Sequence, residues 1–199
     1  MSIYDSNKYT VRDYDVKGKM TITRIEEFPE VLLFGSTVYT DDRGWFTESY
    51  SDKLVEDFFG PPIQHNHSHT KHRGTVRGLH FQNLPHDFGK IVRCTQGAVY
   101  DVIVDVRKDS PTRGNWIGVV LSRSNGLQIL VPRGFAHGFQ ALEHSCDVQY
   151  IQDGYYNAEA ERGINPLDPA VGIEWPYPPE KLSEKDSFAP LLAECDINF

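Results

Sequence analysis

Several histidines stand at spacings that suggest chemistry. Four of them follow one another as His65, His67, His69 and His72. Alternate residues of a β-strand face the same way, so the first three imidazoles could bind a metal ion together. For this run we favour solvent-exposed or phosphate-contacting side chains over a true metal site. A fifth histidine, His80, is a candidate for proton transfer because an imidazole titrates near neutral pH.

The segment 126–137 (GLQILVPRGFAH) resembles the second signature motif of the cupin barrels. Its spacing is G-x5-P-x-G-x2-H, and it ends at His137. In metal-binding cupins an earlier motif supplies two histidines and a glutamate. The matching segment 74–82 contains His80, but Gln82 stands at the second ligand position and no glutamate follows at the expected distance. One imidazole and one amide are a poor ligand set for a first-row metal, so we expect no metal and no other cofactor.

Short β-strands are the elements that must position these residues. Glycines and prolines recur at short intervals, which is typical of a chain of short strands. The clearest strand covers residues 99–107 (VYDVIVDVR), where alternation gives one fully apolar face. We interpret this strand as scaffold rather than chemistry. Further strands are expected at residues 74–82, 90–95, 116–122, 127–131 and 146–152.

Helices are expected to be few and short. Residues 51–60 are the best candidate, with Ser51 as the N-cap and Gly60 at the C-terminal cap. Residues 180–185 are expected to form one short turn of helix. Many short strands and few helices predict an all-β fold, a cupin-like jelly-roll barrel with one or two short peripheral helices.

Composition excludes several classes of protein. The 199 residues include 20 basic and 28 acidic side chains, which gives a formal charge of −8. That charge disfavours a nucleic-acid partner and a membrane anchor, and no apolar run approaches the roughly 20 residues of a spanning helix. Three cysteines without CxxC spacing fit a reducing compartment, so we expect a cytoplasmic protein. We expect an N-terminal arm at residues 1–22 and a single domain at residues 23–199.

From about residue 25 to 192, the chain is similar to the dTDP-4-dehydrorhamnose 3,5-epimerase family. The motifs that carry this resemblance follow one another in the same order, which makes chance agreement implausible. They are D-x-R-G-x-F-x-E (41–48), Q-x-N-x-S (64–68), RGLH (77–80), GK (89–90), DV-x-VD-x-R (101–107), SPT (110–112), GFAHGF (134–139) and S-x-KD (183–186).

The resemblance implies a metal-independent epimerase of a nucleotide-linked 4-keto-6-deoxy sugar. Such an enzyme removes a proton next to the C4 ketone, stabilises the resulting enolate and returns a proton on the opposite face. By resemblance, His80 is the base and Asp186 is its carboxylate partner. Tyr150 is then the donor on the other face, and Lys90 is the cation near the keto oxygen.

The resemblance also implies a set of substrate contacts and a partner. A protein of charge −8 needs converging cations to bind a diphosphate, and several of the implied contacts are cations from separate segments. The family pairs its barrels by exchanging N-terminal strands, so the implied partners are a dTDP-linked sugar and a second copy in a homodimer. The implied substrate-binding residues are Arg43, Glu48, Gln64, Asn66, Arg77, His137, Glu161 and Lys185.

Alternative functions stay open at this point. Relatives on the same scaffold epimerise C3 alone or C5 alone, or act on other nucleotide-linked keto sugars, and a related ketoisomerase shares the enolate but moves the ketone. A non-catalytic sugar-nucleotide-binding module would bind its ligand without exchanging protons with solvent. A metal-dependent cupin would contain stoichiometric metal. Gln82 argues against the metal-dependent cupin, and the complete set of proposed catalytic residues argues against the binding module.

Overall fold

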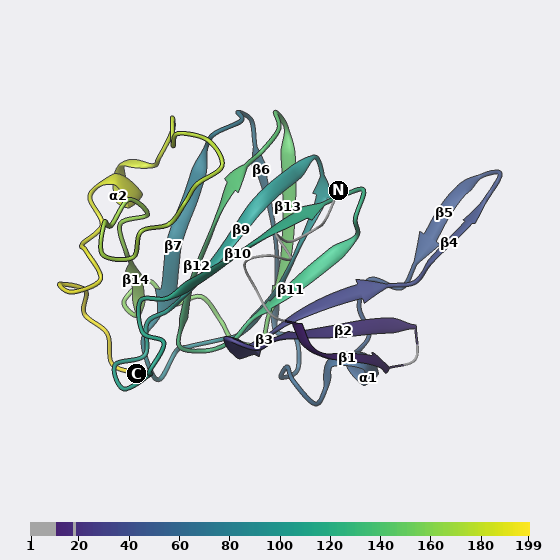
Figure 1. The fold of residues 1–199 in the computed structure, drawn as a ribbon, viewed down its shortest axis with the longest axis horizontal. Helices are drawn as coiled ribbons and strands as arrows, with labels where there is room; N and C mark the ends of the chain where they lie inside the picture. Colours follow the sequence, from purple (N-terminus) through teal and green to yellow (C-terminus); the bar gives the residue numbers. More distant parts are fainter. Residues whose placement is uncertain (1–10, 18) are drawn as a thin grey trace.

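The computed structural model describes residues 11–17 and 19–199, and two β-sheets form its body (Figure 1). The larger sheet contains, in spatial order, β1 (Val11–Lys17), β2 (Met20–Ile25), β3 (Phe28–Ser36), β11 (Leu127–Val131), β8 (Lys90–Gln96), β13 (Cys146–Gln152) and β6 (Gln64–Thr70). The smaller sheet contains β10 (Trp116–Ser122), β9 (Ala98–Asp105), β12 (Phe135–Ala141), β7 (Val76–Gln82) and β14 (Glu161–Gly163). Neighbouring strands in both sheets are antiparallel.

The inner faces of the two sheets form the main hydrophobic core. Val92 and Val148 of the larger sheet belong to the same buried cluster as Ile103 and Phe139 of the smaller sheet. Burying one such side chain contributes about 1.5–3 kcal/mol to folding. This packing fixes the separation of the two sheets, and it therefore fixes the positions of polar side chains that project between them.

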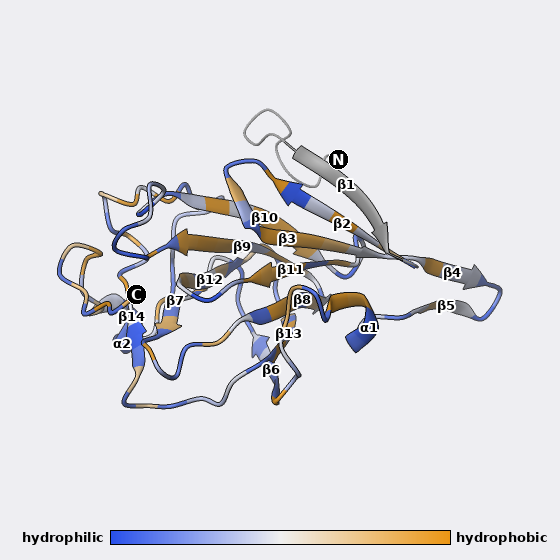
Figure 2. Cartoon of the chain, turned by 90° about the horizontal axis from the view of Figure 1, so that it is seen from below, coloured by the Kyte–Doolittle hydropathy of each residue, from blue (hydrophilic) through white to orange (hydrophobic). Residues whose placement is uncertain are grey.

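Strand β9 is buried on both of its faces. Val99 and Ile103 face the main core, whereas Val102 and Val104 face away from it and lie under the C-terminal part of the chain. Much of the strand is correspondingly orange in Figure 2. Asp101 shares the inward face with Val99 and Ile103, since alternate residues of a strand point the same way. The residues that cover the outward face include Ile164, Val171, Leu192 and Ile197.

Two short helices complete the fold, and both differ from the predicted ranges. Regular helix in the predicted segment 51–60 is restricted to α1 (Asp52–Val55), because the backbone N–H groups of Phe58 and Phe59 both turn back to the carbonyl of Val55. The second helix, α2 (Glu184–Ser187), begins near the end of the turn predicted at residues 180–185 and continues two residues beyond it. The all-β jelly-roll class with two short helices is confirmed.

A close approach of two backbones determines the register next to His80. A Cβ atom built on Gly78 (φ +113°) would lie 2.7 Å from the Cα of Gly138, and one built on Gly138 would lie 2.7 Å from the carbonyl oxygen of Arg77. The two glycines therefore let β7 and β12 approach closely where their register shifts. In this register His80 pairs with His137.

A two-stranded hairpin projects from the body of the molecule. It consists of β4 (Val38–Asp41) and β5 (Gly44–Thr47), and Figure 1 shows it extending away from both sheets. Trp45 and Phe46 are among the most exposed large apolar side chains of the described residues. The hairpin therefore presents apolar surface to its surroundings.

The expected N-terminal arm is described only in part. Residues 1–10 and residue 18 of that arm lie outside the described residues, and residues 11–17 form β1, which pairs with β2. Among the described residues, no helix is both long and apolar enough to cross a membrane.

The contact between β7 and β12 predicts a loss of stability in Gly138→Ala. The added methyl group would press on the backbone oxygen of Arg77, so we expect the free energy of unfolding to fall by about 1–3 kcal/mol. Urea denaturation measures this change. Gly163→Ala is the matched control, because Gly163 lies on the other neighbour of β7 and its added Cβ would be 3.4 Å from the nearest atom. Equal losses in both variants would contradict the steric argument.

Candidate active site

A cavity of about 340 Å³ opens at one end of the barrel. It lies where β6 and β8 begin and where β7 and β13 end. Six of the predicted site residues line it, and they come from both sheets. The lining residues are Gln64, Asn66, His80, Phe81, Gln82, Phe88, Lys90, Tyr150, Gln152, Tyr156 and Glu161.

His80 and Asp186 form a hydrogen-bonded pair at this cavity. The imidazole Nε2 of His80 lies 2.7 Å from Oδ1 of Asp186, which is buried. Burial acts to raise the pKa of Asp186, but hydrogen bonds from His80, Ser183 and the Gly78 N–H outweigh it and hold the pKa below its usual range. The carboxylate therefore stays ionised and holds one imidazole nitrogen, which leaves the other nitrogen to exchange a proton with a ligand.

Lys90 places a cation in the same cavity. Its Nζ lies 5.4 Å from the ring centre of Phe88 and 5.9 Å from that of Tyr150. Burial lowers the pKa of Lys90 to about 8, and attraction to Asp101 and Glu161 acts in the opposite direction. At neutral pH the ammonium form still predominates, so Lys90 can stabilise negative charge that develops on a ligand.

Tyr150 supplies a proton donor from the larger sheet. It lies on β13, whereas His80 lies on β7 of the smaller sheet. Burial raises the pKa of Tyr150, Arg77 partly opposes this effect, and Glu161 adds to it. The phenol therefore remains protonated at neutral pH. A ligand held between the two sheets would meet an imidazole on one side and a phenol on the other.

Asp101 is a residue of this site that the sequence analysis assigned to scaffold. Its carboxylate is fully buried and lies 2.9 and 3.0 Å from Nε2 of His137. Burial lowers the pKa of His137, and Asp101 opposes that effect. The sequence feature that could have identified Asp101 is strand alternation, which places it on the same face as the inward-pointing Val99 and Ile103.

His137, a predicted substrate contact, lies under the cavity rather than on its wall. It is buried and does not appear among the lining residues, although it pairs with His80 across β7 and β12. In this position the imidazole contacts Asp101 instead of open space. His137 would therefore affect a bound ligand only indirectly, through Asp101 and the charged groups near it.

Glu161 and Lys185 come together at the edge of the cavity. Nζ of Lys185 lies 2.6 Å from Oε2 of Glu161, and the hydroxyl of Tyr156 donates to the same oxygen at 2.7 Å. Burial acts to raise the pKa of Glu161, but these two partners outweigh it and the pKa falls below its usual range. The carboxylate is therefore ionised and faces the cavity with two donors already in place.

Besides His137 and Lys185, three further predicted contacts do not line this cavity. Arg77 lies on the same strand as His80, but its guanidinium donates to Oγ1 of Thr70 and to the backbone carbonyl of His69, each at 3.0 Å. Arg43 lies at the end of the β4–β5 hairpin, where its exposed guanidinium pairs with Asp41. Glu48 lines a separate small hollow beside α1 and Tyr50.

The histidine run lies on the outer side of edge strand β6. His65, His67 and His69 are exposed, and Nδ1 of His69 lies 2.6 Å from Oδ1 of Asp147 on the adjacent β13. None of these histidines lines the cavity that contains His80. In the described part of the chain, no group of three or more histidine, cysteine, aspartate or glutamate side chains is arranged to hold a metal ion.

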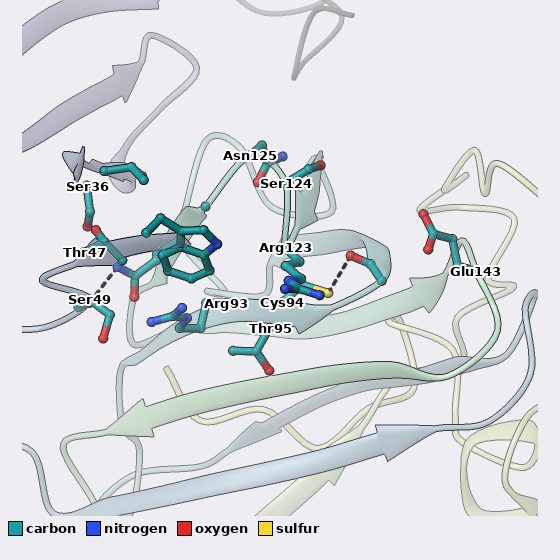
Figure 3. A pocket seen from close by; sticks show the side chains of 15 residues that line it. Ser36, Thr47, Ser49, Arg93, Cys94, Thr95, Arg123, Ser124, Asn125 and Glu143 are labelled. Carbon is teal, nitrogen blue, oxygen red and sulfur yellow. Dashed lines mark hydrogen bonds between the residues drawn. The ribbon is translucent and has the colours of Figure 1, made fainter. Parts of the chain in front are cut away.

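A second cavity, of about 490 Å³, lies between the base of the hairpin and the ends of β8 and β11 (Figure 3). Arg93, Arg123 and Thr95 line it together with hydroxyl groups such as that of Ser49. Burial lowers the pKa of Arg93. None of the residues predicted for catalysis lines this cavity, so it is separate from the site around His80.

The fold and the site together define a class of protein. Two antiparallel sheets enclose a cavity at one end of a jelly roll of the cupin type. A histidine–carboxylate pair, a lysine and a tyrosine converge there. These groups can act as the base, the cation and the proton donor of an enzyme that transfers protons at a carbon next to a carbonyl group.

Comparisons with known proteins identify the family. The profile of a family described as dTDP-4-dehydrorhamnose 3,5-epimerase matches residues 26–194. The dTDP-4-dehydrorhamnose 3,5-epimerase of Salmonella typhimurium is 46% identical over 172 residues, which cover 84% of this chain and 93% of that protein. The chain belongs to the dTDP-4-dehydrorhamnose 3,5-epimerase family, as its motifs predicted.

Solved structures give the same result. A dTDP-6-deoxy-D-glucose-3,5-epimerase from Legionella pneumophila, in complex with dTDP-4-keto-L-rhamnose, superposes with a TM-score of 0.85 at 39% identity and covers 89% of this chain and 95% of its own. A 3'-monoepimerase from Streptomyces bikiniensis, in complex with dTDP-quinovose, has a TM-score of 0.78 at 32% identity, with coverage of 83% and 85%.

The lowered pKa of Lys90 predicts the alkaline side of the pH profile. We expect kcat/KM to fall as pH rises through about 8, because the ammonium group then loses the charge that stabilises an enolate. Steady-state rates from pH 6 to 10 measure this. In Lys90→Arg the guanidinium stays charged, so the remaining activity should show no such decline. A flat wild-type profile, or the same decline in Lys90→Arg, would refute the assignment.

Proposed function

We propose that the chain epimerises dTDP-4-dehydro-6-deoxyglucose at C3 and C5, which yields dTDP-4-dehydrorhamnose, by deprotonation and reprotonation without a metal. The observation that carries this proposal is the convergence of His80, Asp186, Lys90 and Tyr150 on one cavity. The family supports the reaction class, and the Legionella relative in complex with dTDP-4-keto-L-rhamnose supports the kind of ligand.

The proposed reaction begins with proton transfer to His80. The unprotonated ring nitrogen removes the proton from a carbon next to the C4 ketone, and the C–H electron pair forms a carbon–carbon double bond while the carbonyl π electrons move to oxygen. Asp186 stabilises the imidazolium that results, and Lys90 stabilises the enolate oxygen. Each interaction is strongest when charge has developed, so each lowers the barrier.

Return of a proton on the opposite face completes the inversion. Tyr150 donates its phenolic proton to the same carbon as the carbonyl reforms. The phenolate then regains a proton from solvent, and the imidazolium of His80 releases its proton to solvent. The origin of Tyr150 and His80 on opposite sheets supports this division of roles, because the sugar ring would lie between them. The same cycle at the second carbon gives inversion at both C3 and C5.

The remaining predicted contacts are proposed to hold the nucleotide and the diphosphate. Gln64 and Asn66 offer amide donors and acceptors on the cavity wall. Arg77 and Lys185 add positive charge beside it, which a ligand with two phosphates needs in a protein whose formal charge is −8. Glu161 is held by Lys185 and is suited to accept hydrogen bonds from sugar hydroxyl groups.

Proton exchange with solvent tests the proposed function. In heavy water, wild-type protein and dTDP-4-dehydro-6-deoxyglucose should give product with deuterium and inverted configuration at both C3 and C5, read by NMR. His80→Ala removes the base, so exchange should fall by about 100- to 10,000-fold while dTDP binding, measured by calorimetry, stays within about threefold. His65→Ala is the control, because that histidine is exposed on the outer side of β6.

The outcomes of this experiment separate the candidate functions. Deuterium and inversion at one carbon alone would replace the proposal by a mono-epimerase, the activity named for the Streptomyces relative. Binding of the sugar nucleotide without exchange at either carbon would indicate a binding module. Exchange by His80→Ala at the wild-type rate would remove His80 from the mechanism.

We further propose that the working form is a homodimer in which each copy completes the cavity of the other. Arg43 and Glu48, both predicted to bind the nucleotide, are carried on or beside the β4–β5 hairpin and lie outside the cavity of their own chain. The exposed Trp45 and Phe46 of the same hairpin support its insertion into a partner. A hairpin supplied by the second copy would bring all the predicted contacts to one site.

Mixed dimers test this shared site. His80→Ala and Arg43→Ala each damage one function, so each alone should have low activity. When they are unfolded together and refolded as a mixture, half of the dimers contain one cavity with both functions intact, and activity should recover to about a quarter of the wild-type value. A mixture no more active than its components would contradict a cavity shared between copies.

We propose that residues 23–199 act as one catalytic domain, which the family match over residues 26–194 supports. We propose a cytoplasmic location, which is supported by the three cysteines, Cys94, Cys146 and Cys195, all of which are free thiols.

A further inference from the structure

Two loops form the rim of the catalytic cavity. The first, residues 83–89, joins β7 to β8, carries Phe88 and leads directly into Lys90. The second, residues 153–160, joins β13 to β14, carries Tyr156 and leads directly into Glu161. The positions of these loops therefore determine the surroundings of two charged groups in the site.

Gln82 binds both loops with a single side chain. Its Nε2 donates to the backbone carbonyl of His86 at 2.6 Å and to that of Tyr155 at 3.2 Å, and its Oε1 accepts from the backbone N–H of Asn157 at 2.8 Å. The residue is buried, with 4% of its surface exposed. Both amide hydrogens and the amide oxygen are thus used to hold loop backbone.

The same two loops are joined to each other at a second point. Oδ1 of Asp153 accepts from the backbone N–H of Gly89 at 2.8 Å and lies 2.9 Å from a guanidinium nitrogen of Arg133. Nε2 of Gln152 donates to the carbonyl of Gly154 at 2.8 Å. These bonds hold the beginning of the second loop, whereas Gln82 holds its middle, where Tyr156 is carried.

We propose that Gln82 is a positioning residue for the reaction, whose amide holds both rim loops closed over Lys90 and Glu161. The proposal rests on the proposed function, because it assigns Gln82 a role in the same site. It also gives a use to the position at which metal-binding cupins have a ligand. In this chain the residue organises the rim through backbone hydrogen bonds.

The contacts of the loops show how Gln82 would act on the charged groups. Phe88, in the first loop, places its ring 5.4 Å from Nζ of Lys90 and helps to exclude water from the ammonium group. Tyr156, in the second loop, donates to Glu161 at 2.7 Å. Release of either loop would hydrate Lys90 or turn Glu161 away, and misplacement of such groups by about 1 Å can slow a reaction about 100-fold.

The test uses Gln82→Met, which keeps the length of the side chain and removes all three hydrogen bonds. Gln140→Met is the matched control, because Gln140 is also buried and also binds loop backbone with both ends of its amide. Its Nε2 donates to the carbonyl of Tyr177 at 2.9 Å, and its Oε1 accepts from the N–H of the same residue at 3.0 Å. Gln140 pairs with Val76, at the opposite end of β7 from Gln82.

We expect Gln82→Met to lower kcat by about 10- to 100-fold with a smaller change in KM. The alkaline limb of kcat/KM should move to higher pH, because a hydrated Lys90 holds its proton more strongly. An NMR titration of ¹³Cε-labelled lysine, assigned with Lys90→Arg, should show the same upward shift in the protein without substrate. Gln140→Met should lower the melting temperature but leave kcat, KM and the lysine titration within about twofold.

Each outcome decides the proposal. An unchanged titration of Lys90 and unchanged kinetics in Gln82→Met would overturn it, as would equal kinetic losses in Gln140→Met. If Gln82→Met does not fold, Gln82→Asn gives the decision, because its amide is one methylene too short to reach all three partners. The titration needs no substrate, so a failure of the proposed epimerase activity would be seen separately, as wild-type protein that does not exchange deuterium.

Discussion

The buried charge of Lys90 is the feature on which the rest of the site depends. Burial lowers its pKa to about 8, and nearby carboxylates help to keep the ammonium form. Asp101 and Glu161 give that help, yet a buried carboxylate is itself costly unless it is hydrogen-bonded. Asp101 is satisfied by His137, and Glu161 by Lys185. One cation thus accounts for a connected set of polar residues in and beside the cavity.

Packing between the sheets gives these polar groups their fixed geometry. The side chains that act on a ligand arise from strands on both sides of the cavity, and the hydrophobic core beneath them holds the two sheets apart at one distance. The glycine contact at Gly78 and Gly138 adjusts the register locally, directly before His80. Asp186 then reaches the imidazole from α2, outside both sheets. Catalytic geometry is therefore a consequence of how separate layers pack.

Strand alternation, which is local in sequence, predicted the jelly roll. The ordered motifs gave the resemblance to the family, and that resemblance implied that His80, Lys90 and Tyr150 share one site. Alternation could not show that Asp101 belongs to the site, because it shows which residues share a face of the strand but not whether that face meets a polar cavity. A sequence pattern also cannot show whether all the predicted residues reach the cavity of their own chain. The distance from Arg43 to the cavity depends on where a projecting hairpin packs, and that packing involves segments far apart in the chain.

The late position of Asp186 has a consequence for synthesis of the protein. The histidine it serves lies 106 residues earlier, so a growing chain contains every strand of the barrel before it contains the carboxylate. At that stage the outward face of β9, with Val102 and Val104, also lacks its cover from Leu192 and Ile197. A chain made only as far as β14 therefore lacks both the carboxylate partner of His80 and part of the apolar cover of β9. The stretch that contains Asp186, Leu192 and Ile197 thus supplies both catalytic competence and protection from aggregation.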